Sequence, residues 1–102
     1  MIYNIGTTYF GKRYPMKIKD GFILRNVGGQ NVVVALGGAS RSFNGLIRLN
    51  ETGSFLWQQL GHDMTEEELC AALLAEYDVT PEQAAADVAR FIETLEKAAL
   101  LD

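Results

Sequence analysis

The chain has 102 residues, a length that suits one domain built around one hydrophobic core. Hydrophobic residues make up 48% and charged residues 22%, which is ordinary globular composition, and no run approaches the ~18 apolar residues of a membrane span. A single cysteine, Cys70, and a single histidine, His62, exclude an internal disulfide and disfavour a metal site. We therefore expect no metal and no cofactor, and, without a secretory signal, a cytoplasmic protein.

The charge of the chain is divided between its two halves. Residues 1–50 carry seven Lys and Arg against one acid, a net charge of +6, whereas residues 51–102 carry two against twelve, a net charge of −10. This division is typical of a protein with two different partners or of a fold whose halves compensate each other. The alternative is that helices collect glutamate at exposed positions.

Residues 1–15 differ from the rest and are treated as an extension ahead of a domain at 16–102. They hold Tyr3, Tyr9, Phe10 and Tyr14, which is too apolar for a free tail, and they end at a proline. We expect an arm or an edge strand, with a homodimer contact as one alternative. A segment added by cloning is another.

Residues 22–49 have the pattern of a small antiparallel sheet. The apolar run at 22–27 leads into Gly28-Gly29, a hairpin signal, and the β-branched run at 31–36 follows. A third short strand is predicted at 46–49. Three strands this short need helices to cover one face.

Residues 50–99 have the pattern of three helices, each with a recognisable start. Asn50 is a favourable N-cap, Thr65 and Glu68 form a capping box, and Thr80 is followed by a first-position proline. The last helix has apolar positions at steps of three and four, namely Ala84, Val88, Phe91, Ile92, Leu95 and Ala99. The helices are predicted near residues 51–60, 66–77 and 81–98. The order of elements predicts an α+β fold in which a three-stranded meander precedes three helices.

Several segments of this α+β plan resemble the PqqD-like family. The junction Leu49-Asn50-Glu51-Thr52-Gly53-Ser54-Phe55-Leu56-Trp57 is similar to the family's strand-to-helix junction. Further similar blocks are Thr65 to Leu69, Ala75 to Val79, Ala86 to Val88, and Phe91-Ile92. The resemblance covers about residues 16–101. The chain departs from the family in its aromatic extension and in the turn at residues 61–63.

The resemblance implies a winged-helix-like domain that is not an enzyme. Such domains hold the leader of a ribosomally made precursor peptide and present it to a modifying enzyme, commonly a radical S-adenosylmethionine enzyme. The leader and this enzyme are therefore the expected partners, with no nucleic acid and no membrane.

The resemblance also implies that the leader adds as a β-strand along the third strand, beside the third helix. An edge strand favours this because its unpaired N–H and C=O groups can pair with an added peptide. The peptide-binding residues expected on the strand are Asn44, Gly45, Leu46, Ile47, Arg48 and Leu49. Those expected on the helix are Asp87, Arg90, Phe91, Thr94 and Leu95. The alternative for Phe91 and Leu95 is a place in the core. Arg48 and Arg90 suit an acidic leader, or are solvated surface charges.

Other residues of types that often carry out chemistry or bind partners have simpler interpretations. Trp57 is either a partner-facing anchor or a core residue, and the core interpretation is favoured. Cys70 fits a small buried apolar group, and no base is identifiable for a catalytic thiol, so no catalytic residue is expected. The glycine pairs lack the lysine of a phosphate loop, which argues against nucleotide binding.

Two functions of other classes compete with the adaptor. A winged-helix protein that binds DNA needs several Lys and Arg on its recognition helix, whereas the second helix here begins with three glutamates. A structural dimerisation module would bring the basic sheet of one copy against the acidic helices of another.

Overall fold

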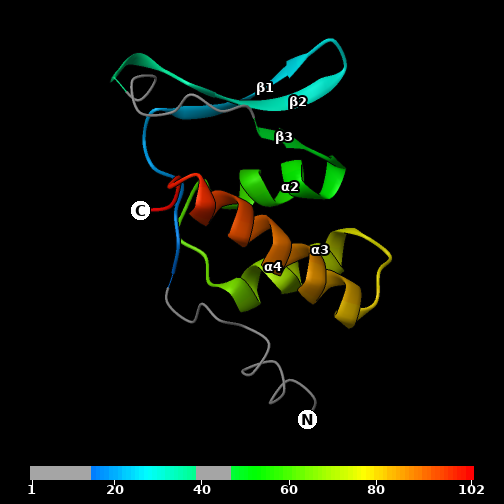
Figure 1. Ribbon diagram of the computed structural model, residues 1–102. Coiled ribbons are helices and arrows are strands. Elements are labelled where there is room, and N and C mark those ends of the chain that lie inside the picture. The colour runs from blue at the N-terminus through cyan, green and yellow to red at the C-terminus, as the bar shows by residue number, and fades with distance from the viewer. Residues whose placement is uncertain (1–14, 39–46) are drawn as a thin grey trace.

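The computed structural model describes residues 15–38 and 47–102. The strands are β1 (Phe22–Val27), β2 (Gln30–Ala35) and β3 (Ile47–Leu49), and the helices are α2 (Glu51–Gln59), α3 (Glu66–Glu76) and α4 (Pro81–Lys97). The strands form one antiparallel sheet in the order β1-β2-β3, and the three labelled helices lie on one side of it (Figure 1). The predicted α+β fold, a meander followed by three helices, is confirmed.

A two-residue turn joins β1 to β2 and fixes their register. Gly28 and Gly29 have φ angles of +60° and +84°, which match the type I′ turn that connects hairpin strands. The turn is closed by Val27 paired with Gln30. β2 therefore begins one residue earlier than the apolar pattern predicted, because the turn needs only the two glycines.

The same turn fixes which backbone groups of β2 face β3. In a two-residue hairpin the closing pair exchanges hydrogen bonds, and every second pair after it does the same. The Leu36 N–H donates to the Gly21 carbonyl at 2.7 Å, which continues this alternation past the end of the strands. Asn31 and Val33 lie between the residues of β2 that bond to β1, so their backbone groups must face β3.

The hydrophobic core lies between the sheet and the helices. Its fully buried large side chains are Met16, Val33, Leu56, Leu60, Leu69, Leu73, Val88, Leu95 and Leu100, together with Cys70. The sheet adds Phe22, Leu24, Ile47 and Leu49, which pack against this cluster. Trp57 is also part of the core, as favoured from sequence.

The chain joins the core from Met16 onward. Met16 exchanges backbone hydrogen bonds with Met64, and Ile18 bridges Leu101 near the C-terminus. The expectation of an arm or edge strand falls on residues that, apart from Pro15, lie outside the described ranges.

A single residue separates β3 from α2, and its side chain fixes the angle between them. The Asn50 Oδ1 accepts from the Gly53 N–H at 2.8 Å, while the Ser54 hydroxyl donates to the Asn50 carbonyl at 2.9 Å. The Asn31 Nδ2 donates to the Ser54 Oγ at 2.9 Å, so β2 is tied to the same turn. A Cβ at Gly53 would meet the Asn50 Oδ1 at 3.0 Å, which explains the glycine there.

α4 ends at Lys97, within one residue of the predicted end, but Ala99 departs from the predicted apolar stripe. Ala99 is exposed and has a φ of +59°, instead of continuing the buried stripe of the helix. The Leu100 N–H donates to the Leu95 carbonyl and the Ala99 N–H to the Glu96 carbonyl, which is the Schellman pattern. Leu100 takes the buried place, because the left-handed residue turns the chain back onto the core.

We predict that Ala99→Gly stabilises the protein. Glycine removes the steric cost of the left-handed conformation, so the free energy of unfolding should rise by about 0.5–1 kcal/mol. Urea denaturation followed by circular dichroism would measure this change. Ala98→Gly, at a right-handed position, is the control and should not stabilise. A loss of stability in Ala99→Gly would contradict the assigned helix end.

Candidate functional site

A groove of about 220 Å³ lies between the end of β3, the first turn of α2 and α4. Its lining residues are Arg48, Leu49, Asn50, Thr52, Gly53, Asp87, Arg90, Phe91 and Thr94. Six of the residues expected from sequence are thus brought together. Sequence reasoning missed Asn50, Thr52 and Gly53, although the N-cap at Asn50 already indicated that the first turn of α2 follows the strand directly.

The other expected residues lie elsewhere. Leu95 is fully buried in the core, beneath the groove, and Ile47 packs against the same core. Phe91 is buried yet contributes to the groove lining, so it serves as part of the floor. Asn44, Gly45 and Leu46 fall outside the described residues.

Among residues 15–38 and 47–102, no strand pairs with the outer side of β3, and the backbone of Arg48 forms this edge. Asn31 pairs with Leu49 and Val33 with Ile47, and these are the residues of β2 whose backbone groups face β3. The alternation then leaves Arg48 as the residue whose N–H and C=O point away from β2. The sheet therefore offers one donor and one acceptor to a further strand at this position.

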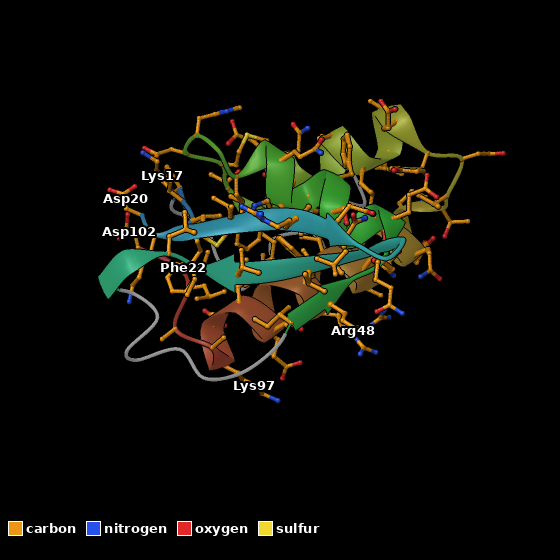
Figure 2. All side chains as sticks on the ribbon, turned by 90° about the horizontal axis from the view of Figure 1, so that it is seen from above. Lys17, Asp20, Phe22, Arg48, Lys97 and Asp102 are labelled. Carbon is orange, nitrogen blue, oxygen red and sulfur yellow. The ribbon has the colours of Figure 1, made fainter. Side chains whose placement is uncertain are left out.

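The side chain of Arg48 lies on the face of the sheet opposite to the core. Ile47 and Leu49 face the core, so the Arg48 side chain stands on the other face of the sheet, where it is exposed. Figure 2 shows it at the outer edge, directed away from the neighbouring strand. Arg48 and Arg90 therefore flank the groove from different sides, a separation that the sequence pattern did not reveal.

On the helix side of the groove, Asp87 holds a central position. Its Oδ1 accepts from the Gln83 Nε2 at 2.8 Å and lies 3.6 Å from the Arg90 guanidinium. The Asp87 side chain is 15% exposed and the Arg90 side chain 66%. The groove wall is therefore negative near its floor and positive at its rim, so an acid fits only at the rim.

The helices lack the charge of a DNA-reading surface. α3 begins with three glutamates. Both basic residues of α4 are paired within the helix, Arg90 with Asp87 and Lys97 with Glu93 at 3.5 Å. Phosphate groups would have to displace these carboxylates, which disfavours nucleic acid.

Comparison with known proteins places this groove in context. The family described as "Coenzyme PQQ synthesis protein D (PqqD)" matches residues 30–101. The chain belongs to the PqqD family.

Two solved structures share the fold. "TbiB1 in Complex with the TbiA(beta) Leader Peptide" is 26% identical with a TM-score of 0.64, and the match covers 84% of this chain and 94% of that one. "Lasso peptide synthetase B1 complexed with the leader peptide" is 16% identical with a TM-score of 0.63, over 85% and 96%. A search of curated proteins found no match.

A second, wider hollow of about 870 Å³ lies on another face of α2 in this PqqD-family chain. It is lined in part by Glu51, Phe55, Glu76 and Tyr77, and the two aromatic rings meet edge to face at 5.5 Å. Partial burial, followed by the charge of Glu51, raises the pKa of the Tyr77 phenol. The hollow shares Arg48, Leu49 and Asn50 with the groove, so the two adjoin at the junction of β3 and α2.

The chemistry of Cys70 does not suit a nucleophile. Burial, followed by the charges of Glu66 and Glu67, raises the pKa of this buried thiol to about 11. A reactive cysteine has a lowered pKa instead.

The ranges that the structure describes also lack two other kinds of site. Residues 15–38 and 47–102 contain no group of three His, Cys, Asp or Glu placed to hold a metal ion. Within those ranges, no helix is long and apolar enough to cross a membrane.

We predict that Cys70 makes the protein less stable as the pH rises from 9 to 11. The pKa of the thiol is 9.0 when solvated and about 11 when folded, so in this window the unfolded state loses its proton first. Urea denaturation at several pH values would show a steeper decline for the natural chain than for Cys70→Ala. Identical slopes would refute the burial argument.

Proposed function

We propose that the protein is a non-catalytic adaptor that binds the leader of a ribosomally made precursor peptide and presents it to a modifying enzyme. The observation that carries this proposal is the outward-facing backbone of Arg48 beside a groove with Phe91 in its floor. Support comes from the match to TbiB1, which is described in complex with a leader peptide and which aligns over most of this chain.

In this proposal the leader adds to the sheet as a strand beside β3. Its backbone pairs with the N–H and C=O of Arg48, which supplies affinity that depends little on sequence. Its side chains alternate between the two faces, so one set enters the groove above Phe91 and Thr94 and the other joins the outer face. The expected residues Asn44, Gly45 and Leu46 remain part of the proposed strand site.

The positions of the two arginines specify the acids that the leader should carry. An acid opposite Arg48 lies on the outer face, whereas an acid near Arg90 lies on the helix side. Because side chains alternate between the faces, the residue numbers of these two acids in the leader should differ by an odd number. An acid aimed deeper would meet Asp87 and be repelled.

The proposed recipient of the loaded adaptor is a modifying enzyme, for which the PqqD resemblance favours a radical S-adenosylmethionine enzyme. One of the solved relatives is described as a lasso peptide synthetase protein, so the enzyme class requires its own test. Sequencing the genes beside this one would identify a candidate enzyme and precursor peptide, and binding of the purified proteins would test each.

We predict that Arg48→Pro weakens leader binding by about tenfold or more, because proline removes the N–H that faces the added strand. The bonds between β2 and β3 do not use this N–H, so the fold should persist. Arg48→Ala is the matched control, since it removes the charge but keeps the donor. Isothermal titration with the leader encoded beside the gene measures both.

Equal affinity of Arg48→Pro and Arg48→Ala would show that strand addition at this edge is wrong. If the natural chain fails to bind that leader, or binds duplex DNA tightly at physiological salt, the adaptor itself is refuted. Circular dichroism of each variant verifies that the fold is retained.

We predict a smaller, salt-dependent effect for the charges. Arg48→Ala and Arg90→Ala should each cost about 0.5–1 kcal/mol of leader-binding free energy, as expected for exposed ion pairs. The double variant should also flatten the dependence of affinity on salt concentration. Lys97→Ala, which removes a charge of α4 outside the groove lining, is the control. Unchanged salt dependence in the double variant would exclude acids of the leader as partners of these arginines.

A further inference from the structure

The outer face of the sheet, which faces away from the helices (Figure 1), has an unusual composition. The pairing register assigns eight side chains to it, namely Ile23, Arg25, Val27, Gln30, Val32, Val34, Leu36 and Arg48. The open face of an antiparallel sheet is ordinarily polar. Here five of the eight are apolar and none is acidic, so the alternation expected of a solvated face is missing.

Exposure of these side chains follows the same pattern. Among the described residues, the large apolar side chains left exposed are Val27, at 56%, and Leu36, at 46%, and both lie on this face. Val32 is only 7% exposed although it is not part of the core beneath the helices. It pairs with Arg25 on one side and Arg48 on the other, so their aliphatic stems flank it.

We infer that this outer sheet face, defined by the eight residues above, is the docking surface for the modifying enzyme. The identity of that partner rests on the proposed function. The enzyme surface that fits is acidic around an apolar centre, because the three strands contribute two arginines and no acid. The acidic helical half of the adaptor repels such a surface and so orients the encounter toward the sheet.

Strand addition would extend this face, so that it consists of side chains from both the adaptor and the leader. A leader paired with Arg48 extends the sheet by one strand, and every second leader side chain then stands on the outer face beside Arg48. An enzyme docked there contacts the adaptor and the bound leader together. The enzyme therefore binds the loaded adaptor more tightly than the empty one, and by linkage strengthens leader binding by the same factor.

The test uses Arg25→Glu and Val27→Asp, which alter the outer face on β1, two strands away from the leader edge. Lys17→Glu makes the same charge reversal at an exposed position beside the C-terminal Asp102, remote from Arg48 (Figure 2). Each variant is titrated with the leader, and the leader-loaded variant is then titrated with the modifying enzyme encoded beside the precursor gene. Leu36→Glu provides a further variant if Arg25→Glu folds poorly.

We expect leader affinity within about twofold of the natural chain in all variants, and enzyme affinity at least about tenfold weaker for Arg25→Glu and Val27→Asp but not for Lys17→Glu. Enzyme binding that is absent in the natural chain, or equal in all variants, overturns the inference while leader binding still supports the proposed function. If the natural chain fails to bind the leader, the proposed function is overturned, and the identity of the partner on the outer sheet face falls with it. A natural dimer that Val27→Asp converts to a monomer, measured by light scattering, would show instead that a second copy covers the face.

Discussion

The arrangement of the candidate site depends on how closely β3 is joined to α2. Asn50 is the only residue between them, and its side chain caps the helix while its carbonyl accepts from Ser54. Any loop at this point would let the strand and the helix rotate independently, and the groove between β3 and α4 would lose its wall. The hydrogen bond from Asn31 to Ser54 extends the same constraint into the sheet.

The alternation of the sheet divides the functions of one short strand. Ile47 and Leu49 pack against the core and direct their backbone groups to β2, so both stabilise the fold, and Leu49 also lines the groove. Arg48 between them has its backbone at the free edge and its side chain on the outer face. A three-residue strand can therefore be stable and still offer both pairing groups and a charge, because the two uses fall on different residues.

The sequence was sufficient for elements defined by local chemistry. The N-caps at Asn50, Thr65 and Thr80 predicted the three helix starts, and each cap is present. The end of α4 was right to within one residue, but Ala99 was wrongly assigned to the buried stripe, because helix periodicity does not reveal that Ala99 turns left-handed and that Leu100 is buried instead. Six of the nine groove residues could be listed from the family resemblance, but the faces of Arg48 and Arg90 could not be distinguished from it. That distinction depends on which residues of β2 exchange hydrogen bonds with β1, because the remaining residues of β2 are the ones that bond to β3.

The division of charge follows from the same geometry. The strands carry arginine on a face that no labelled helix covers, whereas the glutamates of α3 begin a helix and favour the positive end of its dipole. The proposed adaptor would have to distinguish its leader from its enzyme with 102 residues, and opposite charges on opposite layers would separate these two partners without additional surface. Arg48 lies where the proposed peptide edge meets the outer sheet face, so a single residue would belong to both surfaces. If a leader pairs with this edge as proposed, an enzyme docked on the outer face would contact the leader as well, which is the physical requirement for recognising the adaptor only when it is loaded.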